Sequence, residues 1–157
     1  MNRLPRLSTL LLLCCASQFV RSQEQSLKAE VSLTDTSVRN SQPFSLTAVV
    51  RNTGSSERST TIWLCSNREQ WLPDNPIVHV VEINPCQQNA PTVIKLKPGE
   101  RYKGTVTLHI DLPPDSDNSK GVTFRLRFAE PPHLGTLGVA PMKPLRWSNA
   151  VTVFVKK

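Results

Sequence analysis

The stretch TVIKLKPGERYKGTVTLHI, residues 92–110, carries the clearest structural signal in the chain. Apolar residues alternate with charged or polar residues on both sides of Pro98-Gly99. Alternation of period two indicates strands with one buried face and one solvent-exposed face. Proline presets the first central position of a tight turn, and glycine supplies the positive φ that a type II turn needs at the second. The stretch therefore predicts an antiparallel hairpin of two strands joined at Pro98-Gly99.

The rest of the chain repeats this pattern of short alternating segments separated by turn residues. Besides the two hairpin strands, we expect strands over residues 27–33, 44–50, 60–64, 77–83, 122–128 and 147–155. Turn signals such as Asn52-Thr53-Gly54-Ser55 separate the expected strands, prolines lie between them, and no window has helical periodicity. The pattern predicts an all-β fold, an antiparallel two-sheet sandwich of seven to eight strands.

Residues 1–22 have the pattern of a signal peptide. Arg3 and Arg6 precede a nearly uniform apolar run over residues 7–16, which is too short to span a bilayer, and small residues suited to cleavage follow. We expect cleavage after Ser22, a single domain over 23–157, and a secreted or periplasmic, cell-envelope location. A lipoprotein anchor on Cys14 or Cys15 is disfavoured, since Leu13 stands where a small residue is wanted.

Charge argues against a nucleic-acid partner. Cleavage would remove three arginines and no acid, so the formal net charge would fall from +7 to +4. The remaining basic residues are scattered through many strands and do not form one cluster. No apolar stretch of the mature chain has transmembrane length, so we expect no membrane span after cleavage.

Two cysteines, Cys65 and Cys86, remain in the expected mature domain. In an exported domain they predict one disulfide, closing a loop of about 20 residues and contributing roughly 3 kcal/mol in the chain-entropy model. A simple return of the 77–83 strand beside the 60–64 strand would separate them by about 20 Å, too far for a disulfide. Either the 66–76 loop doubles back before Ile77 or the disulfide is absent, and of the two we expect the doubled-back loop. A metal site on these thiols is disfavoured by the absence of further ligands at a suitable spacing.

Three phrases resemble known sandwich domains. They are LTAVVRNTGSS (46–56), LKPGERYKGTVTL (96–108) and WSNAVTVFV (147–155). The chain resembles immunoglobulin-like and fibronectin type III-like modules of secreted and cell-surface proteins, and is similar to bacterial adhesion-type modules and BsuPI-type proteinase inhibitor domains. The resemblance implies a fold and no functional residue, because these phrases mark turns that many sandwiches share.

No combination of residues predicts catalysis. The three histidines are His79 in mid-strand, His109 on the exposed face of its strand and His133 in a loop. None has a partnered nucleophile, so surface or hydrogen-bonding roles are the simpler interpretation. Calcium ligation by Asp111, Asp115 and Asp117 is disfavoured, because the spacing lacks the glycine and terminal glutamate of an EF-hand. The sequence predicts no enzyme activity, no cofactor and no metal.

A basic face is expected across the hairpin. Its residues are Lys95, Lys97, Arg101 and Lys103, on outward positions of the two strands. These side chains can meet an acidic polysaccharide, an anionic lipid surface or an acidic protein. The competing interpretation is a solubilising outer face that discourages pairing between strand edges.

The second candidate binding region is the long loop over residues 130–146. Its candidate contact residues are His133, Leu134, Leu137 and Met142. Long ordered loops are often functional, and prolines reduce the entropy lost on binding. The competing interpretation is a loop packed over the sandwich edge. We therefore expect an exported, non-enzymatic module that binds a protein or glycan or has a structural role, or alternatively a proteinase inhibitor that presents this loop.

Overall fold

The computed structural model describes residues 26–64, 67–82, 90–117, 121–130 and 146–156. The expected signal peptide, residues 1–22, lies outside this part of the chain. The described elements are strands and one short helix: β1 (Leu27–Ser32), β2 (Ser37–Arg39), β3 (Phe44–Asn52), β4 (Arg58–Trp63), α1 (Asn67–Gln70), β5 (Trp71–Pro73), β6 (Val78–Val80), β7 (Pro91–Leu96), β8 (Arg101–Ile110), β9 (Val122–Phe124), β10 (Leu126–Phe128), β11 (Arg146–Trp147) and β12 (Val151–Lys156). The expectation of an all-β chain is confirmed.

The strands form four small sheets. Their orders are β1-β3-β8-β6, β11-β10-β5, β2-β12-β9 and β4-β7. Every pair of neighbours is antiparallel except β12 and β2, which run parallel. The expectation of a purely antiparallel fold is wrong at this edge, because β2 occupies a segment that the sequence pattern presents as a polar connection. Val38 on β2 is buried, and that burial explains why the short segment pairs.

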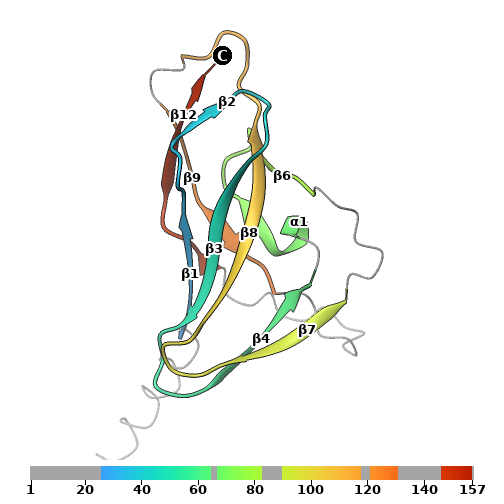
Figure 1. Ribbon diagram of the computed structural model, residues 1–157, viewed down its shortest axis with the longest axis vertical. Helices are drawn as coiled ribbons and strands as arrows, with labels where there is room; N and C mark the ends of the chain where they lie inside the picture. Colours follow the sequence, from blue (N-terminus) through green and yellow to red (C-terminus); the bar gives the residue numbers. More distant parts are fainter. Residues whose placement is uncertain (1–25, 65–66, 83–89, 118–120, 131–145, 157) are drawn as a thin grey trace, which may run out of the picture.

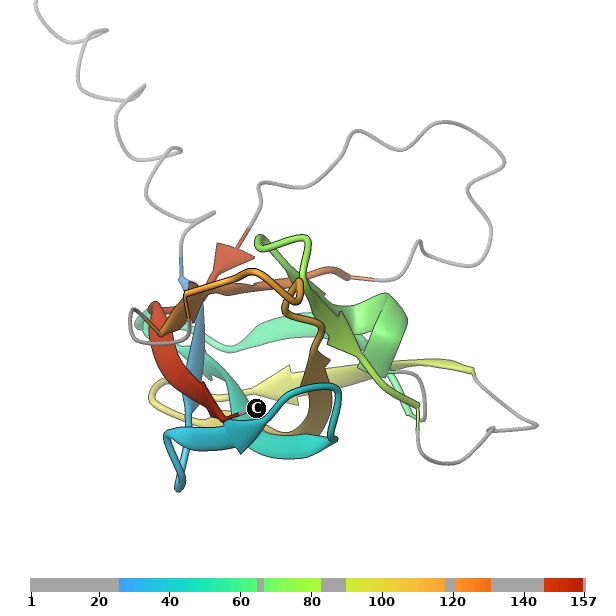
Figure 2. The same ribbon diagram turned by 90° about the horizontal axis from the view of Figure 1, so that it is seen from above.

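The sheets curl around one interior, as the view from above shows (Figure 2). The buried apolar residues form one core cluster. Strand β1 contacts β10 and β11, and β5 contacts β6, so the separate sheets enclose a common space. The central pair of β3 and β8 (Figure 1) supplies the most fully buried residues. These are Leu46, Ala48, Val50, Val106, Leu108 and Ile110. Alternation places them on one face, as the sequence predicts.

Residues 122–128 also turn their apolar side chains inward. Val122, Phe124, Leu126 and Phe128 are all buried, which confirms the alternation. The segment nevertheless forms two strands, β9 and β10, because the backbone changes partner at Arg125. There Asp74 Oδ1 accepts the Arg125 N–H at 2.7 Å, in place of a neighbouring strand.

The predicted hairpin over 92–110 is wrong in its pairing and right in its turn. The Glu100 N–H donates to the Lys97 carbonyl at 2.9 Å, and Gly99 has a φ of +79°, as the Pro98-Gly99 signal predicts. Strand β7 nevertheless pairs with β4, whereas β8 pairs with β3 and β6. The turn is therefore a corner at which the chain passes from one sheet to another (Figure 1).

The side chain of Asn52 holds this corner together. Asn52 is fully buried and its Nδ2 donates to the Leu96 and Ser56 carbonyls, both at 2.8 Å, while its Oδ1 accepts the Gly54 N–H at 2.9 Å. Its backbone N–H donates to Glu100, and its carbonyl accepts from Gly99. The buried side chain of Asn52 thus hydrogen-bonds both to the segment that follows β3 and to the segment that precedes β8. We call these contacts the Asn52 corner.

Three smaller differences from the expected elements have local causes. Helix α1 and β5 lie within the expected 66–76 loop, where Trp71 is buried and packs on Phe128 with ring centroids 5.2 Å apart. Strand β6 covers only 78–80 of the expected 77–83. The last expected strand is interrupted between β11 and β12, where the Asn149 side chain bonds both the N–H and the carbonyl of Val31.

Candidate functional site

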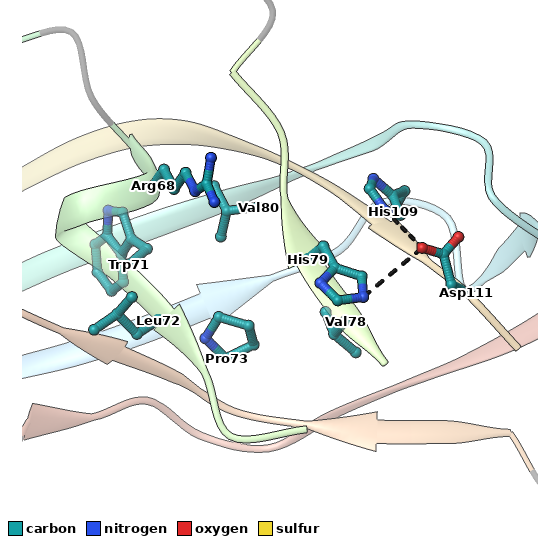
Figure 3. Close-up of a pocket in the computed structure, with 9 residues that line it drawn as sticks. All are labelled: Arg68, Trp71, Leu72, Pro73, Val78, His79, Val80, His109 and Asp111. Atoms are coloured by element: carbon teal, nitrogen blue, oxygen red, sulfur yellow. Dashed lines mark hydrogen bonds and ion pairs between the residues drawn. The ribbon is translucent and has the colours of Figure 1, made fainter. Parts of the chain in front are cut away.

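A groove lies beside α1, β5, β6 and β8 (Figure 3). Its volume is about 420 Å³, and it is open to solvent. The lining residues are Arg68, Trp71, Leu72, Pro73, Val78, His79, Val80, His109 and Asp111. The groove therefore has a mixed polar and apolar lining, with a concentration of ligand-type side chains at the end where β6 meets β8.

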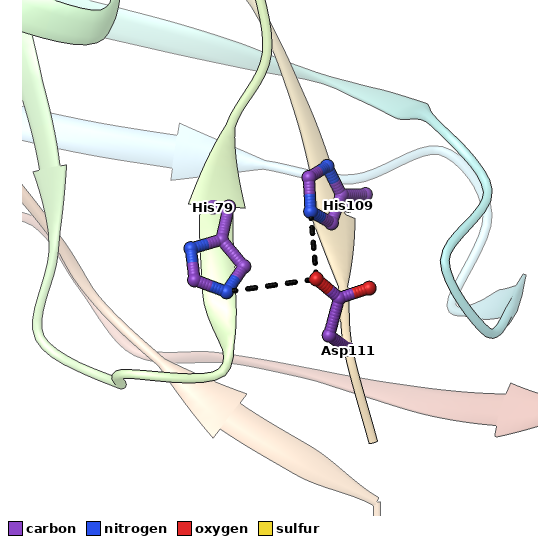
Figure 4. A group of neighbouring side chains, drawn as sticks. All are labelled: His79, His109 and Asp111. Carbon is purple, nitrogen blue, oxygen red and sulfur yellow. Dashed lines mark hydrogen bonds and ion pairs between the residues drawn. The ribbon is translucent and has the colours of Figure 1, made fainter. Parts of the chain in front are cut away.

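At that end, His79, His109 and Asp111 point toward one another (Figure 4). His79 stands directly opposite His109 in the antiparallel pairing of β6 with β8, and Asp111 follows His109 by two residues. Asp111 Oδ2 lies 3.0 Å from His109 Nε2 and 3.7 Å from His79 Nε2, and the imidazole centroids are 5.1 Å apart. One carboxylate oxygen thus faces two ring nitrogens. We call these three residues the His–Asp cluster.

The backbone and one hydroxyl hold Asp111 in place. Its N–H donates to the Ile77 carbonyl at 2.9 Å, and Ser41 Oγ donates to Asp111 Oδ1 at 2.7 Å. The hydrogen bond from Ser41, together with the neighbouring His109 and His79, outweighs desolvation and holds the pKa of Asp111 below its usual range. Asp111 therefore carries a negative charge at neutral pH and directs Oδ2 to the histidines.

The cluster does not have the connectivity of a serine hydrolase. In such enzymes the hydroxyl contacts the imidazole, and the carboxylate contacts the other ring nitrogen. Here Ser41 bonds the carboxylate of Asp111. The arrangement supplies two imidazole nitrogens and a carboxylate oxygen at one point on the surface, which is a set of ligands and not a nucleophile with its base.

The sequence shows each member of the cluster but not the contact between them. His79 and His109 lie in the similar segments Val78-His79-Val80 and Leu108-His109-Ile110, so each alternates with apolar neighbours. The predicted hairpin places 92–97 beside 101–110 and does not indicate the observed pairing of β6 with β8. Asp115 and Asp117 are not members of the cluster, whose described residues are only these three.

A second polar surface lies on the outer face of β1, β3 and β8. Lys28 stands opposite Arg51, and Arg51 stands opposite Arg101. Lys103 follows two residues later on the same face of β8, and all four are exposed. Glu30 forms an ion pair with Lys28 at 3.2 Å. We call Lys28, Arg51, Arg101 and Lys103 the basic row.

The basic row differs from the basic face that the sequence predicts. All four predicted residues are exposed, but Lys95 lies on β7, opposite Ser59 of β4, and not beside β8. Arg101 and Lys103 share one face of β8, where Lys28 and Arg51 join them from neighbouring strands. The difference follows from the wrong hairpin pairing, because cross-strand neighbours decide which charges share a face.

The predicted binding loop and disulfide lie outside the described residues. This applies to His133, Leu134, Leu137 and Met142, and to Cys65 and Cys86. The structure does show the residues that border the loop. Phe128 stands opposite Arg146 in the pairing of β10 with β11, and Arg146 forms an ion pair with the buried Glu130 carboxylate, which also accepts a hydrogen bond from Thr60. The two ends of segment 131–145 are therefore held together.

Comparison with known proteins gives no family for this chain. No family model matches it, and no curated protein matches it. Among solved structures, Salmonella alpha-2-macroglobulin reacted with methylamine is similar at a TM-score of 0.46 and 12% identity, over 83% of this chain and 7% of that one. The Pseudomonas fluorescens alkylpurine DNA glycosylase AlkC bound to DNA containing an abasic site analog is similar at 0.38 and 8%, over 84% and 31%. The chain thus spans a small part of each.

Proposed function

We propose that this chain is an exported, non-enzymatic immunoglobulin-like β-sandwich module that binds an anionic polysaccharide on the outer face of β1, β3 and β8. The observation that carries the proposal is the basic row, in which Lys28, Arg51 and Arg101 stand directly opposite one another. Like charges in register destabilise a sheet, so folding alone gives no reason for this arrangement. A bound polyanion would neutralise the repulsion.

The dimensions of the row suit an extended polymer. Neighbouring strands lie about 4.8 Å apart and alternate residues of one strand about 6.6 Å apart, so the cations cover roughly 10 Å by 7 Å of a sheet face. Sulfate or carboxylate groups repeated along a chain can meet several of them at once. Such binding depends on charge and weakens as salt screens it.

The row lacks the apolar centre that protein interfaces have. Fully buried interface centres are enriched in aromatic and other apolar residues. The exposed large hydrophobic residues of the described chain, Leu64, Val93 and Phe154, lie outside the basic row. The observations therefore favour a polysaccharide over an acidic protein as the partner.

The test is calorimetric titration of the protein with heparin as a sulfated probe. Arg101→Glu should weaken binding at least about tenfold, which corresponds to about 1.4 kcal/mol. Arg39 is exposed and lies on β2, away from the row. Arg39→Glu makes the same change in net charge and should change affinity by less than about threefold. Equal losses in the two variants would mean a response to net charge and would contradict the proposal. Binding to poly-glutamate but not to heparin would indicate that the partner is an acidic protein and not a polysaccharide.

A proteinase inhibitor is the second candidate. The supporting observation is the closed base of segment 131–145, where β10 pairs with β11 and Arg146 bonds Glu130. Holding the ends of a recognition loop together reduces the entropy that binding must remove. Inhibition of a panel of proteases, lost on replacing residues 133–142 with a Gly/Ser segment, would support this function. Absence of inhibition across the panel would contradict it.

A further inference from the structure

We propose that the His–Asp cluster binds a divalent transition-metal ion, Zn²⁺ by preference, through His79 Nε2, His109 Nε2 and a carboxylate oxygen of Asp111. The ligand atoms of the three residues all lie within 4.8 Å of one another. They come from two adjacent strands in fixed register. The proposal is independent of the polysaccharide surface, which lies on other residues.

The separations match a metal site that needs little adjustment. Zinc binds imidazole nitrogen at about 2.0–2.1 Å and carboxylate oxygen at about 2.0–2.2 Å, so tetrahedral ligand atoms lie about 3.3 Å apart. Asp111 Oδ2 is 3.0 Å from His109 Nε2 and 3.7 Å from His79 Nε2. These two values bracket the tetrahedral separation, and the remaining pair of ligand atoms, on His79 and His109, lies within 4.8 Å.

The donor set selects the kind of metal. Two imidazoles with one carboxylate suit zinc, copper, nickel or iron, whereas calcium and magnesium prefer oxygen ligands throughout. Three protein ligands leave a fourth position, which in zinc proteins is taken by water or a bound molecule. Here that position adjoins an open groove lined by Trp71, Val78 and Arg68 (Figure 3).

Ser41 acts as a positioning residue for the metal. Its hydroxyl occupies Asp111 Oδ1 and leaves Oδ2 for the metal. Hydrogen bonds of this kind to ligating carboxylates typically change metal affinity about 10–100-fold. Ser41 also has a φ of +55°, in the left-handed region that residues other than glycine and asparagine seldom adopt. The turn thus keeps an unfavourable conformation at the residue that orients the carboxylate.

The experiment is calorimetric titration of the full chain with Zn²⁺ alone at pH 7.5, after alkylation of all thiols so that cysteines do not bind the metal. We expect one ion per chain. His109→Ala and Asp111→Asn should each weaken binding at least about tenfold. Asp115→Asn, an exposed aspartate outside the cluster, is the matched control and should bind as wild type. All four proteins should have the same far-UV circular dichroism spectrum.

Further variants separate the roles of single residues. Ser41→Gly should weaken zinc binding about tenfold without loss of stability, because glycine tolerates the positive φ. No saturable binding by wild type would overturn the proposal. Full affinity in His109→Ala and Asp111→Asn, or loss of binding in His133→Ala alone, would overturn it equally.

Discussion

Strand β8 has a polar cluster at each end, and the two clusters differ in their burial and in the groups to which they bond. The Asn52 corner adjoins its first residue, Arg101, and the His–Asp cluster adjoins its last, Ile110. Asn52 is 0% exposed, and its side chain makes three hydrogen bonds to backbone groups. The side chain of Asp111 is 48% exposed, and one of its oxygens faces two imidazoles.

Burial and bonding partners distinguish a structural polar group from a candidate functional one. A buried polar group that satisfies backbone groups stabilises the fold, because removing it leaves those groups unpaired away from water. An exposed cluster can lose a member with little effect on folding, since water replaces the lost partner. The same strand thus ends in a polar group that the fold needs and in another that is available to a ligand.

The largest effect is expected at Asn52. Asn52→Ala leaves the Leu96 and Ser56 carbonyls and the Gly54 N–H without their partner, so the free energy of unfolding should fall by about 3 kcal/mol or more. The control is Asn67, whose side chain donates one solvent-exposed hydrogen bond, to the Thr105 carbonyl. Asn67→Ala should lower stability by about 1 kcal/mol or less. Urea denaturation measures both, and equal losses would contradict the structural role of the corner.

An intermediate effect is expected at the turn of the same corner. Gly99 has a φ of +79°, and no atom lies within 4 Å of the position that an added Cβ would take, so Gly99→Ala tests conformation alone. The variant should lose about 1–2 kcal/mol. Gly104 on β8 has no positive φ, and an added Cβ there would meet only the Tyr102 ring at 3.9 Å. Gly104→Ala should therefore be neutral or stabilising by up to about 1 kcal/mol in urea denaturation. A larger loss at 104 than at 99 would contradict this account.

The smallest effect concerns pH. The folded-state pKa of Asp111 is held down by Ser41 and the two histidines, so its ionised form adds stability above the unfolded pKa of about 4 and loses it as pH falls through the lower folded pKa. Asp111→Asn should thus lose less stability than wild type on acidification below about pH 4. The deficit of Asn52→Ala should not depend on pH. Thermal unfolding between pH 2 and pH 7 measures both, and parallel pH profiles for wild type and Asp111→Asn would contradict the assignment.

Local sequence patterns predict the local features of this fold. Alternation indicates the buried faces of β3, β8, β9 and β10, and the glycine of Pro98-Gly99 has the positive φ that its turn requires. These features depend only on residues that are neighbours in the chain. The pairing of β7 with β4 and of β8 with β6 depends on contacts between distant segments, which period-two alternation does not specify.

The candidate site cannot be predicted from the sequence pattern either, because it also depends on the pairing of distant segments. His79 and His109 are 30 positions apart in the sequence and directly opposite in the sheet. Each alone is an ordinary polar residue of a strand, and only the register of β6 with β8 brings His79 beside His109 and Asp111. The role of Ser41 is equally hidden in the sequence, because its left-handed φ arises in a turn that also pairs with Ile110.

The most direct test is urea denaturation of wild type and Asp111→Asn, each with and without Zn²⁺ at about 100 times its dissociation constant. Without zinc, Asp111→Asn should be less stable than wild type at pH 7.5 only by the small contribution of the ionised carboxylate, because the Asp111 side chain is exposed. With zinc, wild type should gain about 2.7 kcal/mol by linkage and Asp111→Asn much less. An unchanged wild type, an equal gain in the variant, or a zinc-free loss as large as that of Asn52→Ala would contradict the division between a structural and a ligand-binding end of β8.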